Sequence, residues 1–296
     1  MSNMYAIRTT NLTKYYGKSR GIVDLNLAVK KGEFFGFIGP NGAGKSTCIR
    51  TLLGLIKCSS GSATVLGLDM EQDKTEILKR VGYMPSETMF YAGMRVKDVL
   101  KLSADLRKVN CSEEARILCE RLQLDVNKKV EELSFGNKKK VSIVCALQHK
   151  PELLILDEPT SGLDPLMQRE FFQILQERNA EGTTIFLSSH ILAEVQRNCT
   201  RAGIIREGRL IACDSVEALS QTKAKRVHVQ GNVNLEELSQ VRGLRQTENG
   251  LTFLYGGEIK QLLEVLSKQP IQDVSISEPD LEEIFMHYYV DGGEAQ

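Results

Sequence analysis

The chain has 296 residues, of which 42% are hydrophobic, and its 38 Lys and Arg residues balance 38 Asp and Glu residues. This length suffices for two domains. The zero net charge gives no indication of a bulk electrostatic attraction to nucleic acid or anionic lipid, and it leaves local charged patches open. No run approaches the roughly 18 apolar residues of a membrane span and the first residues form no secretory signal, so we expect a soluble, cytosolic protein.

The first predicted elements are two β-strands. Residues 5–8 and 22–29 alternate apolar and polar side chains, which is typical of strands with one exposed face. Tyr15 and Tyr16 precede a glycine between these strands. An aromatic residue at a strand end is by itself the simpler interpretation, but its position just ahead of a nucleotide-binding motif makes it a candidate platform for stacking a base.

That motif is a phosphate loop, with an apolar strand pattern over 33–38 before it and a helical pattern over 47–53 after it. It matches the template G-x-x-x-x-G-K-[ST] and comprises Gly39, Pro40, Asn41, Gly42, Ala43, Gly44, Lys45 and Ser46, followed by Thr47. The glycines leave backbone N–H groups free to surround a phosphate chain, and the helix adds its positive N-terminal end. We expect Lys45 to reach the β- and γ-phosphates and the Ser46 hydroxyl to bind Mg²⁺.

The next region is predicted to be mostly helical. After short strands over 61–67 and 81–85 and a helix over 74–79, apolar residues recur at the helical period between 95 and 147. This pattern predicts a helical insertion over about 87–150. The run from Lys138 to Lys140 lies within it and has no interleaved aromatic residues, so we interpret it as the solvated face of a helix and not as a nucleic-acid site.

A buried strand over 153–156 follows, because its four apolar residues do not alternate with polar ones. It ends in Asp157 and Glu158, where a phosphate-loop enzyme would hold Mg²⁺ and polarise a water molecule. Two solvated loop carboxylates would explain the pair alone, but the phosphate loop favours the catalytic interpretation.

A helix over 165–179 leads to another buried strand over 183–187, which has a polar end at His190. A lone histidine is more often structural than catalytic. Ligands of open α/β sheets, however, bind at the carboxyl ends of the strands. His190 is therefore a candidate site residue.

Taken together, these motifs resemble the ATP-binding cassette subunit of an ABC transporter, over residues from about 5 to 219. The resemblance rests on motifs in the family's order, namely GPNGAGKS at 39–46, LSFGN at 133–137, LLILDEP at 153–159, SGLD at 161–164, and His190. It implies an α/β phosphate-loop core with an antiparallel β portion and a helical subdomain, which binds ATP and Mg²⁺.

The resemblance also implies roles within one site. Tyr16, with Tyr15 as the second candidate, would stack on adenine. Asp157 would hold Mg²⁺ through water, and Glu158 would polarise the attacking water. His190 would contact the γ-phosphate and help to orient that water.

Other implied roles connect two subunits, and one motif departs from the family pattern. Ser134 and Gly136 of the signature LSFGN, which is usually LSGGQ, would meet the γ-phosphate bound by a second copy, and Asp164 would link the two sites. The family commonly has a Mg²⁺-coordinating Gln after VGYMP, where this chain has Ser86. Glu87 follows and is the candidate substitute at the metal.

As a partner the resemblance implies a separate membrane permease, with two cassettes on the cytoplasmic face driving export. The form LSFGNKKK resembles variants of the ABC-2 type exporter branch, and no nucleic-acid partner is expected. A soluble ABC ATPase acting on ribosomes or nucleic acid is the alternative, although such proteins usually carry two cassettes or a long coiled coil. A small-molecule kinase would need neither LSFGN nor SGLD. The seven cysteines show no metal-binding spacing and suit a reducing compartment.

The remaining residues are predicted to form a second domain, with residues 1–222 as the ATP-binding domain and 223–296 as a small α+β accessory domain. Its pattern is βαββαβ-like, with a strand over 226–230, a helix over 235–241, a hairpin over 244–255, a helix over 259–266, a strand over 271–276 and a closing helix over 280–289. It carries no catalytic constellation, so regulation or dimer contact is its expected role.

Overall fold

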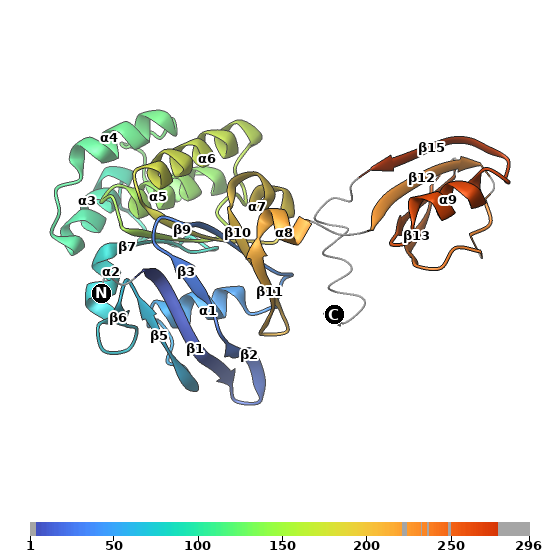
Figure 1. The fold of residues 1–296 in the computed structure, drawn as a ribbon. Coiled ribbons are helices and arrows are strands. Elements are labelled where there is room, and N and C mark those ends of the chain that lie inside the picture. Colours follow the sequence, from blue (N-terminus) through green and yellow to red (C-terminus); the bar gives the residue numbers. More distant parts are fainter. Residues whose placement is uncertain (1–3, 221–223, 232, 236, 248–249, 278–296) are drawn as a thin grey trace. The chain divides into compact units, whose positions relative to one another are not determined.

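The computed structural model of the chain describes residues 4–220, 224–231, 233–235, 237–247 and 250–277. The chain divides into two compact units, Met1–Val216 and Glu217–Gln296. Figure 1 shows their elements coloured along the sequence. The boundary predicted between residues 222 and 223 falls within 221–223, outside the described residues.

A six-stranded sheet forms the centre of the first unit, in the order β11–β10–β4–β9–β8–β7. Its strands are β4 (Phe34–Ile38), β7 (Val81–Met84), β8 (Leu153–Asp157), β9 (Thr184–Ser189), β10 (Arg201–Arg206) and β11 (Arg209–Ser215). All neighbours pair in parallel except β10 and β11. Parallel pairing places the carboxyl ends of β4, β8 and β9 at one edge, so the segments that follow these strands must meet there.

The predicted burial of the central strands is confirmed. Every residue of β4, β8 and β9 is buried, and Phe186 packs against Phe35 and Phe37 with ring centroids 5.8 and 5.3 Å apart. A strand covered on both faces has no solvent side, which is why its sequence does not alternate.

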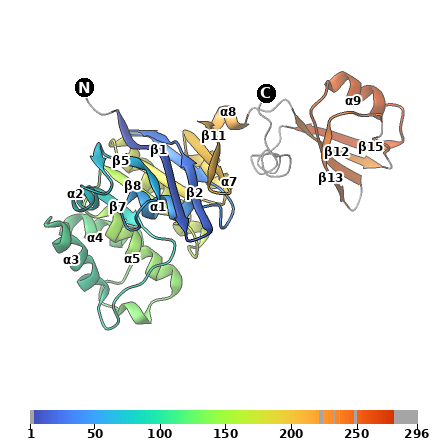
Figure 2. The ribbon, with the colours of Figure 1, turned by 90° about the horizontal axis from the view of Figure 1, so that it is seen from below.

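An antiparallel sheet lies on one side of this centre, in the order β2–β1–β5–β6, and β3 also pairs with β1. Its strands are β1 (Tyr5–Tyr16), β2 (Ser19–Leu25), β3 (Ala28–Lys30), β5 (Ser60–Val65) and β6 (Leu68–Asp69). The helix α1 (Lys45–Leu52) packs between the two sheets, because its Cys48, Ile49 and Leu52 share one core with residues of both (Figure 2). The strand predicted over 5–8 is the first part of the longer β1, which runs on to Tyr16.

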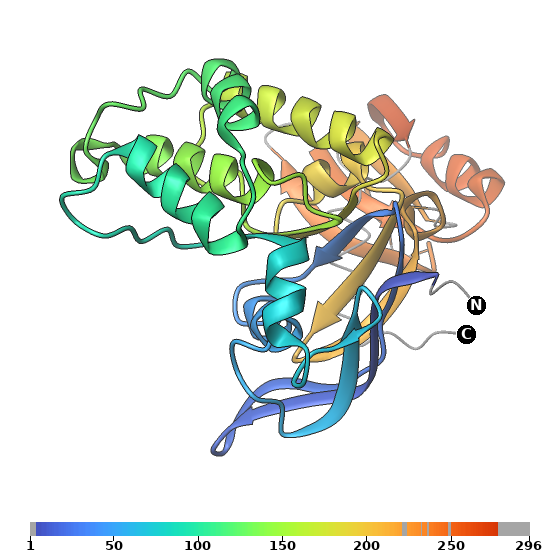
Figure 3. The ribbon, with the colours of Figure 1, turned by 90° about the vertical axis from the view of Figure 1, so that its left-hand side faces the viewer.

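Helices cover the other side of the six-stranded sheet (Figure 3). They include α5 against β7, α6 against β9, and α7 against β4 and β9. Besides α1, the helices of this unit are α2 (Lys74–Arg80), α3 (Val96–Arg107), α4 (Ser112–Arg121), the short 3-10 helix η1 (Val130–Glu132), α5 (Phe135–Leu147), α6 (Pro165–Ala180) and α7 (Leu192–Asn198). The short helix α8 (Val216–Ser220) follows at the boundary with the second unit. Between β7 and β8 the chain is helical, as its periodicity predicts. No helix among the described residues is both long and apolar enough to cross a membrane.

The second unit is a four-stranded antiparallel sheet in the order β13–β14–β12–β15, with α9 packed on one face. Its elements are β12 (Lys225–Gly231), β13 (Val241–Thr247), β14 (Gly250–Tyr255), α9 (Ile259–Leu266) and β15 (Ile271–Ser277). The core joins Leu262 and Leu266 of α9 to Val227, Val229 and Phe253 of the sheet.

One predicted element of this unit is wrong, and another cannot be compared. The helix expected over 235–241 is absent, because the described residues there form turns and Val241 begins β13. Leu238 nevertheless lies in the core. The backbone of Asn234 exchanges hydrogen bonds with the Gln269 side chain, so this segment packs against the core as a loop. The closing helix predicted over 280–289 lies outside the described residues.

Candidate nucleotide-binding and hydrolysis site

The phosphate loop connects β4 to α1 and leaves the start of that helix free. Gly44 precedes α1 with a φ of 108°, in the left-handed region, and a Cβ atom placed on it would lie 2.6 Å from the carbonyl oxygen of Gly21. Only glycine fits this position without displacing a neighbouring backbone. The start of α1 carries no side-chain cap, so its first N–H groups remain available to a phosphate.

Lys45, the first residue of α1, is 6% exposed. Its ammonium group donates hydrogen bonds to the carbonyl oxygens of Gly39 at 2.6 Å and Pro40 at 3.2 Å. It also lies 3.2 Å from Glu158 Oε1, which forms an ion pair. The structure therefore holds the predicted phosphate-binding cation against the predicted catalytic carboxylate.

Glu158 lies between two predicted partners. Its Oε1 faces Lys45, and its Oε2 lies 2.7 Å from His190 Nδ1. The residue has a φ of 50°, which is uncommon for a residue with a side chain. Three residues that are far apart in the sequence are thus brought together at the carboxyl ends of β4, β8 and β9. A carboxylate oriented in this way can accept a hydrogen bond from a water molecule or take up its proton.

Asp157 is fully buried beside this group. Its Oδ1 accepts a hydrogen bond of 3.0 Å from the Ser188 hydroxyl, whereas its Oδ2 has no hydrogen-bond partner. An unpaired, buried carboxylate oxygen is costly unless a cation or a water molecule satisfies it. Ser188 is a site residue that the sequence analysis missed, and its place next to His190 at the end of β9 is the signal that could have identified it.

The oxygen donors near the phosphate loop suit Mg²⁺, which needs only a few protein ligands, better than a metal ion whose ligands all come from the protein. Mg²⁺ is usually bound by one or two carboxylates or hydroxyls together with phosphate oxygens and water. Asp157 and the half-buried Ser46 provide oxygen donors of this kind. Within the described ranges, no group of three or more His, Cys, Asp and Glu residues could hold an ion by itself.

Tyr16 ends β1 near the start of α1. Its side chain is 47% exposed, and the Lys14 ammonium lies 5.2 Å from the ring centroid. A Cβ atom on Gly21 would meet both the Tyr16 ring at 3.3 Å and the Thr47 methyl group at 2.8 Å. Gly21 thus lies against both the Tyr16 ring and the first turn of α1. An exposed aromatic ring beside the first turn of α1 suits base stacking, but Tyr15 is similarly exposed at 42%, so the choice of Tyr16 stays a prediction.

The signature LSFGN and the SGLD motif pack against each other. A Cβ atom on Gly162 would lie 2.2 Å from the Phe135 ring, and one on Gly136 would lie 2.6 Å from the Gly162 carbonyl oxygen. Ser134 caps α5 by accepting a hydrogen bond of 3.3 Å from the Asn137 N–H. Phe135, which replaces the usual glycine, therefore covers Gly162 with its ring and remains 54% exposed.

Three predicted binding residues are not brought to Lys45 and Glu158. Asp164 caps α6, since its Oδ1 accepts hydrogen bonds of 3.0 Å from the N–H groups of Leu166 and Met167. Ser134 is exposed and Gly136 half-buried at the start of α5. Within the described part of the chain, none of Ser134, Gly136 and Asp164 makes a hydrogen bond or ion pair with the Lys45–Glu158 group.

Ser86, which stands where the family has the metal-coordinating Gln, and Glu87, its candidate substitute, follow β7. Ser86 is half-buried and Glu87 is exposed. The contact that the structure shows here involves the backbone, because the Ser86 carbonyl oxygen accepts a hydrogen bond of 2.7 Å from Lys139. Metal binding by either side chain stays a prediction.

The interpretation of the lysine run as a solvated face is wrong for its middle member. Lys139 is 0% exposed, whereas Lys138 and Lys140 are half-buried. Burial lowers the pKa of Lys139, and the nearby charges of Asp157 and Glu158 act in the opposite direction. Helical spacing could have identified it, because residues 142, 143 and 146, three, four and seven positions further on, are all buried.

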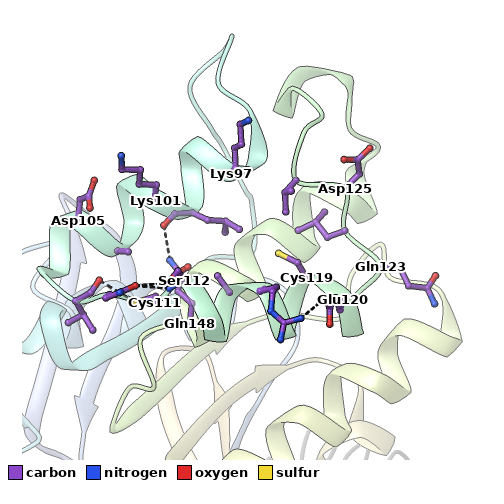
Figure 4. Close-up of a pocket in the computed structure, with 18 of the residues that line it drawn as sticks. Lys97, Lys101, Asp105, Cys111, Ser112, Cys119, Glu120, Gln123, Asp125 and Gln148 are labelled. Atoms are coloured by element: carbon purple, nitrogen blue, oxygen red, sulfur yellow. Dashed lines mark hydrogen bonds and ion pairs between the residues drawn. The ribbon is translucent and has the colours of Figure 1, made fainter.

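A separate cavity of about 1090 Å³ lies between α3 and α4. Figure 4 shows Lys97 and Lys101 on one wall and Cys119 and Glu120 on the other, and Gln148 donates a hydrogen bond of 3.0 Å to the Leu100 carbonyl oxygen. None of the predicted site residues lines this cavity.

The fold and the site define a phosphate-loop nucleoside triphosphatase. The family model described as ABC transporter matches residues 22–161. The bacitracin transport ATP-binding protein of Bacillus licheniformis is 36% identical over 298 residues, covering 95% of this chain and 96% of that protein. The linearmycin resistance ATP-binding protein of Bacillus subtilis is 35% identical over 211 residues, covering 70% of this chain and 68% of that protein.

A solved structure of an ATP-binding subunit of an ABC transporter superposes with a TM-score of 0.69 and 29% identity, over 72% of this chain and 91% of that one. The chain belongs to the ATP-binding proteins of ABC transporters. It is therefore an ATP-binding protein of an ATPase family, and the resemblance inferred from its motifs is confirmed.

Proposed function

We propose that the chain hydrolyses ATP in the presence of Mg²⁺ and drives export through a separate membrane permease, on whose cytoplasmic side it lies. The observation that carries this proposal is the position of Glu158 between Lys45 and His190 at the carboxyl edge of the sheet. The family assignment supplies the link to transport.

Each site residue has a task in this proposal. Glu158 polarises the attacking water, and His190 orients the Glu158 carboxylate and contacts the γ-phosphate. Lys45 exchanges its contacts with the loop carbonyls for phosphate oxygens, and Tyr16 stacks on the adenine base. Mg²⁺, held by Ser46 and Asp157, would neutralise charge on the phosphates.

We further propose that a second copy of the chain completes the site. A phosphate loop leaves one side of the γ-phosphate open, and the transition state needs hydrogen-bond donors there as well. The Ser134 hydroxyl, Gly136 and the start of α5 are donors of this kind. Ser134 is exposed and Gly136 is half-buried, and among the described residues neither bonds to the Lys45–Glu158 group of its own chain. Asp164, packed next to the signature through SGLD, would contact the opposite subunit.

Mixing two defective variants tests this arrangement. Lys45→Ala removes the phosphate-binding cation, and Ser134→Arg blocks the signature. In a mixed dimer one site carries both defects and the other carries none, so we expect the mixture to recover ATPase activity that neither variant shows alone. Activity is measured with the permease present, after the mixed dimer has been isolated. Absence of recovery would contradict two independent sites completed in trans.

Export is supported by relatives that are named for bacitracin transport and for linearmycin resistance. We propose that the exported substrate is an antibiotic, as the names of these relatives indicate for theirs, and bacitracin is the first compound to test. Bacteria sensitive to bacitracin, expressing the chain with its permease, should tolerate a higher antibiotic concentration than bacteria expressing Glu158→Gln with the same permease. Equal tolerance in the two strains would contradict ATP-driven export of this compound.

A further inference from the structure

Lys139 is a buried cation at the centre of the first unit. It lies on α5, five residues after Ser134, and its side chain is 0% exposed. Lysine is rarely buried unless its ammonium group is well paired, because removing the charge from water is costly. A lysine in this position therefore calls for a specific set of partners.

Its partners are three backbone carbonyl oxygens from two other segments. The ammonium donates hydrogen bonds to Ser86 at 2.7 Å, Glu158 at 3.2 Å and Pro85 at 3.5 Å. Among the described residues, no carboxylate forms an ion pair with it, although Asp157 and Glu158 lie close enough to favour its charge. The three donors of the ammonium group are thus all directed to the main chain.

One of these carbonyls belongs to a strained residue. Glu158 has a φ of 50°, a conformation that residues with side chains rarely adopt unless neighbouring contacts enforce it. Its N–H donates to the Ser188 carbonyl oxygen at 3.0 Å, and its own carbonyl oxygen accepts from Lys139. These two hydrogen bonds hold the backbone from which the Glu158 carboxylate projects toward Lys45 and His190.

We propose that Lys139 is a positioning residue for ATP hydrolysis, which holds the left-handed backbone of Glu158 and the carbonyl of Ser86 against α5. The inference rests on the role of Glu158 proposed above. It adds that α5 contributes to two sites. The helix begins at the signature, which faces the second copy, and little more than one turn later its Lys139 holds the backbone of Glu158 in its own chain. Movement of α5 would then change the orientation of the Glu158 carboxylate directly.

The test compares Lys139→Met with Lys140→Met in the full chain. Methionine keeps the length and volume of the side chain but cannot donate hydrogen bonds, and Lys140 is the half-buried neighbour in the same helix. We expect Lys139→Met to lower kcat by about 10²-fold, the loss that a misplacement of about 1 Å can cause. The Kd for a non-hydrolysable ATP analogue should change by less than about threefold, and Lys140→Met should match the wild type in both values.

Amide hydrogen exchange provides a readout other than activity. In Lys139→Met we expect faster exchange in the peptides that contain 85–88 and 156–160, with unchanged exchange in the second unit. If Lys139→Met does not fold, Lys139→Gln keeps donors on a shorter side chain. We expect it to show the same local change in exchange and a loss in kcat of about tenfold.

A double variant separates positioning from a structural role. Because Lys139 acts through Glu158, adding Lys139→Met to Glu158→Gln should lower the residual turnover little further. Wild-type kcat in Lys139→Met, a parallel loss of kcat and ATP affinity, or additive losses in the double variant would each overturn the inference. Wild-type turnover in Glu158→Gln would instead reject the role of Glu158, and hydrogen exchange would then decide whether Lys139 holds its backbone.

Discussion

At the scale of single residues, the site depends on the orientation of one carboxylate. Glu158 faces Lys45 at 3.2 Å with one oxygen and His190 at 2.7 Å with the other, while its backbone is held in a left-handed conformation. Asp157, the preceding residue, is instead fully buried and keeps one oxygen without a partner. Adjacent carboxylates thus face different surroundings, which suits one of them to a metal ion and the other to water.

Glu158→Gln tests this division. Glutamine has nearly the same shape but cannot take up a proton, so turnover should fall by at least the roughly 10²-fold typical of losing a general base, while ATP still binds. Steady-state hydrolysis and equilibrium binding of ATP measure the two effects separately. Glu76→Gln, an exposed change on α2, serves as the control and should leave both unchanged. Near-normal hydrolysis by Glu158→Gln would contradict the assignment.

At the scale of elements, the segment that follows α5 carries a half-buried histidine. His149 Nε2 lies 3.3 Å from the Val81 carbonyl oxygen of β7. Burial, followed by the charge of Arg107, lowers the pKa of His149 from 6.5 to about 4. The folded protein therefore keeps this imidazole neutral where an unfolded chain would already bind a proton.

This difference predicts a loss of stability in acid. Well above pH 6.5 neither state is protonated at His149, and the contribution is fully present. As the pH falls from 6.5 toward 4, the unfolded state gains a proton first, so the free energy of unfolding should decrease by up to about 3 kcal/mol. Urea unfolding at pH 7 and pH 5 should show a smaller loss for His149→Gln than for the wild type. Equal losses would contradict this contribution.

At the scale of the whole molecule, the chain consists of two units with separate cores. The core of the first joins both of its sheets and α1, and the core of the second joins its own sheet and α9. All predicted nucleotide-site residues, from Tyr16 to His190, belong to the first unit. We therefore expect nucleotide binding to require no residue of the second.

A shortened chain that ends at residue 220 tests this independence. Because the first unit has its own core, residues 1–220 should unfold cooperatively and bind ATP with an affinity within about threefold of the full chain. Calorimetry and ATP titration measure the two properties. A shortened chain that is insoluble or lacks a cooperative transition would show that the second unit is needed for folding.

Much of the site could be predicted from the sequence because its residues follow buried strands. Short apolar runs marked β4, β8 and β9. The phosphate loop, Glu158 and His190 come directly after these strands, and Asp157 ends β8. Parallel pairing alone then predicts that these segments meet at one edge. The helix predicted over 235–241 is wrong because apolar residues at 235 and 238 do not require a helix. A loop can bury the same side chains without helical hydrogen bonds.

What the sequence determined by itself is local, namely the phosphate loop, the buried strands, the helical periods and the family to which the motifs belong. Only the tertiary structure decided which polar groups face one another. In the sequence Lys139 is one of three consecutive lysines, and helical spacing places it on the buried face of α5 without giving its partners. Its burial and its hydrogen bonds to Ser86 and Glu158 arise because α5 packs beside the segments that follow β7 and β8, 53 and 19 residues away along the chain. A buried charge is satisfied by whichever acceptors the fold brings to it, and these acceptors are backbone atoms that every residue carries.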